Sequence, residues 1–260
     1  MEGIVKREER KQAIMDLLVT ARAVDLDDLA DRFSVSKMTI HRDLDDLEQA
    51  GLLRKIRGGA TVESGTQFES DFRIRAMQDA EAKARMARAA ADLVEPGMTV
   101  MVNDGSMAAL LASTLVDKRP LTVITNNAAV LDVLRTEPGI TLIALGGIYS
   151  AKYNAFFGVV TEGALSRLRA DLAFISTPAV AGCRAFHMDD EVVRTKRAMM
   201  NAGAQSCLLI NHKRFGRSAL HVLADLTEFD AIITDAAPAP EDRAAMDRAG
   251  IKLTIARDAT

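Results

Sequence analysis

The sequence has only two cysteines, Cys183 and Cys207, among its 260 residues. Two thiols cannot supply a disulfide framework or a four-cysteine zinc site, so we expect both to be reduced. Long apolar segments are missing as well: the longest mainly apolar run covers 108–116, and the opening MEGIVKREERKQ has no apolar core after its charges. A membrane-spanning helix needs about 20 apolar residues, so these absences predict a soluble, cytoplasmic protein.

The sequence also lacks the common cofactor and metal signatures. It has no Walker-type GxxxxGK[ST] segment, and no GxGxxG follows a predicted strand, which disfavours nucleotide binding. His187, Asp189 and His212, with Cys183 nearby, do not have the spacing of a standard metal site. We therefore expect neither a cofactor nor a metal ion. The net charge of −3 excludes a uniformly basic nucleic-acid binder but leaves local basic patches open.

Three helix patterns follow one another near the start of the chain. The first covers about 6–19, where apolar residues recur at helical spacing. Asp25 is a good N-cap for a second helix that ends near Phe33, and Ser36 is a good N-cap for a third. The two-residue gap at 34–35 predicts a helix-turn-helix. The apolar stripes of the three helices are Ile14, Leu17 and Leu18; Leu26, Leu29, Ala30 and Phe33; and Ile40, Leu44 and Leu47.

The third helix, which begins in the stretch VSKMTIHRDL, carries its cations at the front. At about 100° per residue, Met38, His41 and Arg42 point away from the apolar stripe. Lys37 and Thr39 lie on its two flanks. Four acidic residues come one to two turns later: Asp43, Asp45, Asp46 and Glu48. Only the first turns of a recognition helix meet the major groove, so cations in front and acids behind favour DNA binding.

A short hairpin is predicted directly after this helix. Gly51 ends the helix, and LLRKIRGGATV at 52–62 predicts two strands around the glycine pair at 58–59. Beside a recognition helix such a hairpin is a wing, whose cations would reach phosphates or a minor groove: Arg54, Lys55 and Arg57. The alternative is a small helical bundle with ordinary surface cations. Caps, turn length, wing and charge placement together favour the winged helix-turn-helix.

The segment VSKMTIHRDLDDLEQAGLLRKIRGGA, residues 35–60, resembles the signature of the DeoR family of bacterial transcription regulators. The family usually reads TIRRDL or TIHRDL at the centre of this signature. The resemblance implies contacts with DNA bases for Ser36, Lys37, Thr39, His41 and Arg42.

The pattern changes after residue 62. Residues 63–76 have no sustained apolar period and predict a linker, and the alanine-rich stretch 79–94 predicts a helix. Six apolar runs then alternate with helical stretches: TVMVN, LTVITN, ITLIAL, DLAFIS, SCLLIN and DAIITD. Such strands form a mainly parallel sheet covered on both faces. The sequence thus predicts an α/β protein with a winged helix-turn-helix at 1–62, a linker at 63–76 and an α/β domain at 77–260.

Polar residues and glycines follow the predicted strands, where ligands of parallel sheets bind. A helix that opens at Asp104, Gly105 and Ser106 would offer free backbone N–H groups to an anion, for which phosphate is the natural candidate. Asn127 follows the next strand, and the glycine pair at 146–147, where the backbone can approach a ligand closely, follows the one after. Connectors of these kinds also occur commonly without a ligand.

Further basic groups fall near the same strand ends. Lys196 comes about a turn after Asp190 and Glu191, and the segment NHKRFG at 211–216 follows the strand SCLLIN. Both would reach a sugar phosphate. Lys152, close behind the glycine pair, would line a pocket for a polyol chain. The alternatives are a solvated helix face for Lys196 and an ordinary surface loop for Lys152.

Residues from about 79 to 255 resemble the sugar-phosphate sensor domain of the same family, whose fold is related to phosphosugar isomerases. NDGSMA, TNN, LGG, EVVRTK and NHKRFG stand where the family has a DSGSTT-like loop, a TNS-like strand end, a Gly-Gly turn, an acid-to-lysine helix and a DxSKFG-like segment. The chain departs from the pattern where Met107 and Ala108 replace hydroxyl residues, and where Asn211 and Arg214 replace an acid and a lysine. The resemblance implies effector contacts by Asn103, Asp104, Gly105, Ser106, Asn126, Asn127, Gly146, Gly147, Lys196 and Arg214.

Two functions follow from these patterns. The leading hypothesis is a repressor of a carbohydrate or polyol catabolic operon that binds double-stranded operator DNA as a homo-oligomer, a dimer or a tetramer, under control of a phosphorylated sugar or polyol. The alternative is a phosphosugar isomerase-like enzyme with a DNA-binding appendage. Isomerisation needs a positioned base, and none of Asp104, Asp190 and Glu191 has a recognisable histidine partner. We therefore do not expect an enzyme.

Overall fold

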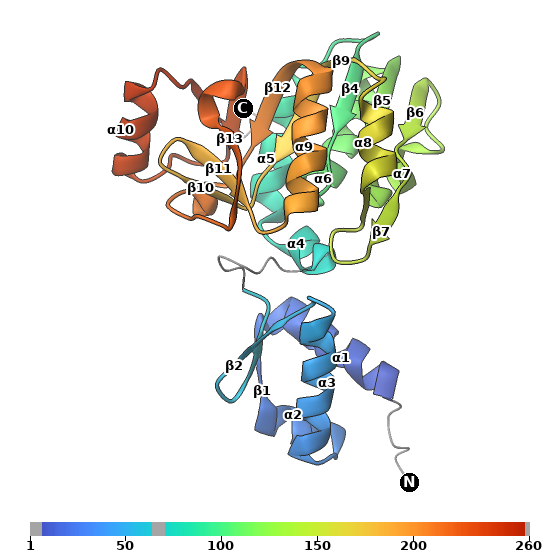
Figure 1. The fold of residues 1–260 in the computed structure, drawn as a ribbon, viewed down its shortest axis with the longest axis vertical. Helices are drawn as coiled ribbons and strands as arrows, with labels where there is room; N and C mark the ends of the chain where they lie inside the picture. The colour runs from blue at the N-terminus through green and yellow to red at the C-terminus, as the bar shows by residue number, and fades with distance from the viewer. Residues whose placement is uncertain (1–6, 64–70, 258–260) are drawn as a thin grey trace. The chain divides into compact units, whose positions relative to one another are not determined.

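The chain folds into two compact units, Met1–Gln78 and Asp79–Thr260, in a computed structural model that describes residues 7–63 and 71–257 (Figure 1). The first unit holds α1 (Arg7–Ala21), β1 (Ala23–Asp25), α2 (Leu26–Phe33), α3 (Lys37–Gln49), β2 (Arg54–Ile56), β3 (Gly59–Thr61) and α4 (Phe72–Met77). The predicted helix-turn-helix is confirmed, with α3 as its second helix.

The N-caps expected from the sequence set the boundaries of α2 and α3. The Asp25 carboxylate accepts the backbone N–H groups of Asp27 and Asp28 at 2.7 and 3.3 Å. The Ser36 hydroxyl accepts the N–H of Thr39 at 3.2 Å. These caps satisfy donors that the first helical turn leaves without partners, and so fix where each helix begins. Between the helices, Ser34 takes the left-handed conformation, with φ of 51°, that closes the tight turn.

The wing is a three-stranded antiparallel sheet with the order β1-β3-β2, and β1 was not predicted. The hairpin turn falls on Arg57 and Gly58 rather than on the two glycines, because Gly59 already pairs with Ile56 as the first residue of β3. Gly59 is needed for another reason. A Cβ atom there would lie 1.9 Å from the carbonyl oxygen of Val24, so β1 can approach β3 only at a glycine.

Two of the four acidic residues of α3, Asp43 and Asp46, are paired with the basic start of α1. Arg10 Nε lies 2.5 Å from Asp43 Oδ2, and both side chains are buried. Asp46 Oδ2 lies 2.5 Å from Arg7 Nη2 and 3.4 Å from Lys11 Nζ. The sequence pattern led us to expect only that acids behind the cations are tolerated. The structure shows instead that they attach α3 to α1.

The expected linker at 63–76 becomes helical in its last part. Asp71 caps α4 by accepting the N–H of Arg73 at 2.9 Å, and Phe72 and Ile74 are buried. Ile74 joins the apolar core of the first unit. A six-residue helix is too short to show an apolar period, which is why the sequence pattern did not reveal it. Residues 64–70 lie outside the described residues.

The second unit is larger. Its helices are α5 (Ala80–Ala91), α6 (Ser106–Leu115), α7 (Ala128–Leu134), α8 (Val159–Leu165), α9 (Asp190–Ala202) and α10 (Pro240–Arg248), with 3-10 turns η1 (Val116–Lys118), η2 (His212–Arg214) and η3 (Leu226–Glu228). Its strands are β4 (Thr99–Val102), β5 (Leu121–Thr125), β6 (Ile140–Ala144), β7 (Ile148–Ser150), β8 (Ala155–Phe157), β9 (Ala170–Ser176), β10 (Ala179–Ala181), β11 (Arg184–His187), β12 (Gly203–Leu209), β13 (His221–Asp225), β14 (Ala231–Thr234) and β15 (Leu253–Ile255).

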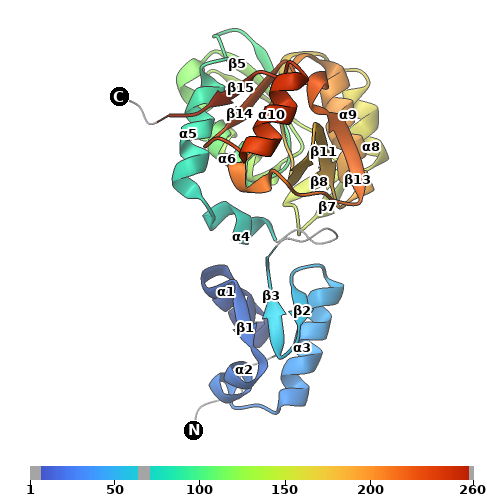
Figure 2. The same ribbon diagram turned by 90° about the vertical axis from the view of Figure 1, so that its left-hand side faces the viewer.

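A seven-stranded sheet with the order β15-β14-β12-β9-β4-β5-β6 forms the centre of this unit, and every neighbouring pair is parallel. Val100 and Val102 of β4 pack against α5, α6 and α7, while Met101 between them packs into the layer of α8 and α9. Figures 1 and 2 show helices on both faces of the sheet. The predicted α/β class and all six predicted strands are confirmed.

Two small sheets were not predicted. Strands β10, β11 and β13 form one, and β7 pairs with β8 in the other. Most of these strands have only three or four residues, too few for alternation to stand out in the sequence. Within the described ranges, no helix combines the length and the apolar character needed to cross a membrane. Both cysteines are free, and burial, reinforced by the nearby Asp230 carboxylate, raises the pKa of the Cys207 thiol to about 12.

The pairing of α3 with α1 yields a stability prediction. Asp43→Asn removes the buried carboxylate that is paired with Arg10, so we expect the first unit to lose about 3 kcal/mol of unfolding free energy. Asp45→Asn is the matched control, because that side chain is 49% exposed and its pair with Lys55 should contribute less than about 1 kcal/mol. Urea unfolding of the full chain measures both losses. Equal losses would contradict the role given to the buried pair.

Candidate DNA-contacting face and ligand site

The front of α3 is exposed where the sequence predicted DNA contacts. Lys37, His41 and Arg42 are exposed, whereas Ile40 and Leu44 of the same helix are buried in the core of the first unit. The hydroxyls of the predicted contacts Ser36 and Thr39 lie 2.9 Å apart at the helix start. The first turns of α3 thus present cationic and hydrogen-bonding groups to solvent.

The strands of the wing lie beside this helix (Figure 2), and their segment carries further cations. Arg54 and Arg57 are exposed, and Lys55 is half-buried. Lys55 Nζ contacts Asp45 Oδ1, and Lys37 Nζ lies 2.7 Å from Asp27 Oδ2. The hydrogen bond and the charge of Asp27 raise the pKa of Lys37 above its ordinary value. We call these cations and their supporting hydroxyls the DNA face: Ser36, Lys37, Thr39, His41, Arg42, Arg54, Lys55 and Arg57.

The second candidate site lies at the carboxyl ends of the parallel strands. Asn103 and Asp104 follow β4, and Lys196 of α9 reaches the same place from the helix layer. Lys196 Nζ donates a hydrogen bond to the carbonyl of Ser176 at 2.7 Å and lies 3.3 Å from Asp104 Oδ1. The Lys196 and Asp104 side chains are each only 3% exposed. Asp104 Oδ1 is therefore ion-paired, although no hydrogen bond of good geometry reaches it among the described residues.

Asn126 and Asn127 after β5 have different roles. Asn127 Nδ2 donates to the carbonyls of Asn103 and Gly105 at 3.3 and 3.0 Å, and its Oδ1 accepts the N–H of Ala129 at 3.0 Å. Asn127 therefore holds the loop after β4 and caps α7. Asn126 Nδ2 donates to the carbonyl of Phe156 at 2.9 Å, which leaves its buried Oδ1 without a hydrogen-bond partner in the described structure.

In the glycine pair after β6, packing within the protein requires a glycine at position 147. A Cβ atom on Gly147 would lie 2.3 Å from the carbonyl oxygen of Phe157 and 2.4 Å from Thr161 Oγ1. The Thr161 hydroxyl donates to the carbonyl of Gly146 at 2.7 Å. The close approach predicted at this turn is thus made by β8 and α8. A Cβ atom on Gly146 would meet nothing within 4 Å.

Sequence reasoning missed Lys83. This buried lysine of α5 donates from Nζ to Ser106 Oγ at 3.0 Å, so it reaches the first turn of α6. A single lysine in an alanine-rich helix gives no signal that its amine is buried. Only the packing of α5 against α6 shows it.

The two remaining predicted contacts lie in connecting segments. Lys152, between β7 and β8, places its ammonium 5.1 Å from the centre of the Tyr153 ring. Arg214 is half-buried in η2, and its N–H donates to the carbonyl of Asn211 at 2.9 Å. Asn211 itself has a buried Nδ2 without a hydrogen-bond partner in the described part of the chain.

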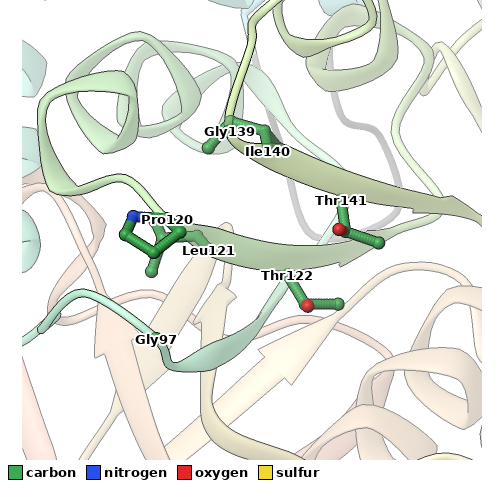
Figure 3. A pocket seen from close by; sticks show the side chains of 7 residues that line it. All are labelled: Gly97, Pro120, Leu121, Thr122, Gly139, Ile140 and Thr141. Atoms are coloured by element: carbon green, nitrogen blue, oxygen red, sulfur yellow. The ribbon is translucent and has the colours of Figure 1, made fainter.

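Of the hollows in the second unit, one lies near this edge and two lie at the opposite ends of the strands, one of them, of about 440 Å³, lined by Arg169 and Asp171. The hollow near the edge, of about 380 Å³, borders η2, and in it His212 Nδ1 lies 2.7 Å from Asp235 Oδ2. The remaining one, drawn in Figure 3, lies at the opposite ends of β5 and β6 and is lined by Thr122 and Thr141 with no ionisable group. The carboxyl edge, with its buried polar side chains, is the better candidate for binding chemistry. None of its described acidic, histidine and cysteine side chains form a group able to hold a metal ion.

A winged helix-turn-helix with an exposed cationic front, joined to an α/β unit with a buried polar cluster, defines a DNA-binding regulator with a ligand-sensing domain. Comparison with known proteins agrees. The DeoR-like helix-turn-helix domain matches residues 10–66, and the DeoR C terminal sensor domain matches residues 78–236. The chain belongs to the DeoR family of transcription regulators, which confirms the resemblance seen in the sequence.

Individual relatives are regulators as well. The glycerol-3-phosphate regulon repressor of Escherichia coli is 28% identical over 90% of this chain and 93% of its own length. The L-fucose operon activator of Haemophilus influenzae is 32% identical over 80% of this chain and 84% of its own. These relatives support a transcriptional regulator rather than an enzyme. A ribose 5-phosphate isomerase from Methanocaldococcus jannaschii overlaps 53% of this chain and 55% of its own at 16% identity, with a TM-score of 0.39, too low to bear on function.

The buried pair at the carboxyl edge can be tested by stability. Lys196→Met removes the counter-charge of the buried Asp104, and we expect a loss of about 3 kcal/mol in unfolding free energy of the second unit. Adding Asp104→Asn should recover part of the lost stability, because the buried carboxylate without a counter-charge is then replaced by a neutral amide. Chemical denaturation of the single and double variants gives the coupling. Additive losses would mean that the two groups do not interact.

Proposed function

We propose that this chain represses an operon for carbohydrate or polyol breakdown and releases its operator when a phosphorylated sugar or polyol binds at the carboxyl edge of the sheet. The observation that carries the proposal is a set of buried polar atoms at that edge that have no hydrogen-bond partner within residues 7–63 and 71–257. Buried polar groups are normally hydrogen-bonded, so atoms such as Asn126 Oδ1 and Asn211 Nδ2 favour a ligand that completes them.

The start of α6 is the proposed phosphate end of the site. Its N-cap, Gly105, supplies no side-chain cap, so the first N–H groups of a ten-residue helix are available to an anion. Lys83 reaches Ser106 in that turn, and the buried Lys196 adds a second ammonium group. These groups compensate for Met107 and Ala108, which stand where hydroxyls would otherwise help hold a phosphate.

The proposed hydroxyl end of the site lies at Asn126 and Asp104. The amide orientation of Asn126 follows from its contact with the Phe156 carbonyl, because only the NH₂ group can donate to a carbonyl. Its Oδ1 is therefore an acceptor without a hydrogen-bond donor among the described residues, and Asp104 Oδ1, although ion-paired with Lys196, receives no hydrogen bond there either. A phosphate dianion cannot donate, whereas a sugar or polyol hydroxyl can. The site thus suits a ligand with hydroxyls at one end and an anion at the other.

The relatives support a phosphorylated sugar or polyol as the ligand and repression as the mode of regulation. Besides the glycerol-3-phosphate regulon repressor, they include the lactose phosphotransferase system repressor of Streptococcus mutans, 29% identical over 89% of this chain and 93% of its own. The fucose operon activator shows that a relative of this chain can have the opposite sign. We propose a homo-oligomer, a dimer or a tetramer, that acts in the cytoplasm on operator half-sites spaced by about 10 base pairs or a multiple.

The DNA face can be tested with the DNA upstream of the chain's own coding sequence. Arg42→Ala should weaken binding to the operator by about 5-fold to 150-fold, since a bidentate arginine–guanine contact contributes about 1–3 kcal/mol of discrimination. Arg54→Ala should weaken all duplexes alike and reduce the salt slope by about 1. Fluorescence anisotropy at several salt concentrations separates the two effects. If Arg42→Ala bound the operator as tightly as the wild type, the proposal that α3 enters the major groove would be contradicted.

The ligand site can be tested with a panel of sugar and polyol phosphates. We expect one of them to raise the melting temperature, with no turnover, and to release the DNA. Ser106→Trp should abolish that release and leave DNA binding intact, because the indole would fill the start of α6. Release that survives Ser106→Trp would exclude this loop from the site, and turnover at enzymatic rates would favour an isomerase.

A further inference from the structure

Both lysines of the DNA face hold an acidic partner from their own domain. Lys37 Nζ lies 2.7 Å from Asp27 Oδ2 of α2, and these side chains are 61% and 62% exposed. Lys55 Nζ contacts Asp45 Oδ1 of α3 itself. In addition, the backbone N–H of Lys55 donates to Glu48 Oε1 at 2.7 Å. In the protein without DNA, each of these lysines is therefore paired with a carboxylate, which a DNA phosphate would have to replace.

The arginines of the same face differ from the lysines. Arg42, Arg54 and Arg57 are exposed, and each lacks an ion pair within the part of the chain that the structure describes. Arginine reads guanine with two parallel hydrogen bonds, whereas the lysine ammonium acts on phosphate as a point charge. The acidic partners are thus paired with Lys37 and Lys55, whose ammonium groups suit sequence-independent contacts. Arg42 of α3, which suits base recognition, has no such partner among the described residues.

The surroundings of these lysines are also acidic. Within residues 1–62, twelve aspartates and glutamates outnumber eleven lysines and arginines. Asp27 raises the pKa of Lys37, and the charges of Asp31 and Asp25 act in the same direction. A domain that gained its affinity mainly from phosphate contacts would show an excess of basic residues.

We propose that Asp27 and Asp45 are specificity-determining residues: they compete with DNA phosphates for Lys37 and Lys55 and so hold down binding to unrelated DNA. The inference rests on the DNA-binding role assigned to the DNA face. Exposed ion pairs open easily, so each lysine can exchange its carboxylate for a phosphate. The displaced carboxylate then lies within the screening distance, about 10 Å at 0.1 M salt, of the DNA backbone and repels it.

This competition acts unequally on the two kinds of binding. Binding to unrelated DNA rests almost entirely on phosphate contacts, while operator binding adds base contacts, among them those of Arg42, which has no acidic partner in the described part of the chain. Phosphate contacts contribute to both kinds of binding. When they are weakened, the fraction of a DNA site that is bound depends more on the base contacts. Repulsion built against the wrong partner is a general route to specificity.

The test measures affinity for a short duplex of unrelated sequence at several salt concentrations. Asp27→Asn should tighten binding by about threefold or more near 0.1 M salt and should steepen the dependence of log K on log salt by up to about 0.9. Asp16→Asn is the control, because it makes the same change in net charge at an exposed acid of α1 whose partner is Gln12. It should change affinity much less.

A double-mutant cycle shows whether the effect passes through the lysine. In a Lys37→Met background, Asp27→Asn should lose most of its gain; Asp45→Asn should behave likewise with Lys55→Met. Equal gains from Asp16→Asn and Asp27→Asn would overturn the proposal in favour of net charge alone. Weaker binding by Asp27→Asn would overturn it as well, because the acid would then be positioning the lysine. A wild-type chain that binds no duplex would instead refute the DNA-binding assignment itself.

Discussion

The ion pair between Arg10 and Asp43 fixes how α3 is rotated about its axis. A buried carboxylate without a partner costs several kcal/mol, so rotations of α3 that move Asp43 away from Arg10 are excluded. His41 and Arg42 precede Asp43 directly and are therefore turned to solvent. The buried Asp43 and the exposed cations at the front of α3 thus depend on the same orientation of the helix.

A similar constraint orders the carboxyl edge of the sheet in the second unit. Lys196 and Asp104 are almost fully buried and compensate each other, and Asn127 ties the loop after β4 to the strand end after β5. Most polar groups there are used to hold the loops in place. Among the described residues, the few atoms without a hydrogen-bond partner, above all Asn126 Oδ1, are held in position by this network and belong to the proposed ligand site.

Much of this arrangement follows from the sequence, and its limits have physical causes. Local signals such as the Asp25 and Ser36 caps, the apolar stripes and the six central strands were enough to predict the two folds and their main elements, but not β1, α4 or the two small sheets. Contacts between distant residues were not predictable: the Arg10–Asp43 pair spans α1 and α3, and Lys83 reaches Ser106 from another helix. The site residues were placed by their position at strand ends, but their separate roles depend on hydrogen bonds that only the folded chain shows.

The central claim is that the front of α3 enters the major groove of operator DNA. Dimethyl sulfate protection on the DNA upstream of the chain's own coding sequence tests it most directly, because the reagent methylates guanine N7, which faces the major groove. The account predicts two patches of N7 protection related by two-fold symmetry. Protection confined to minor-groove adenines, with every guanine N7 still reactive in the bound complex, would contradict it.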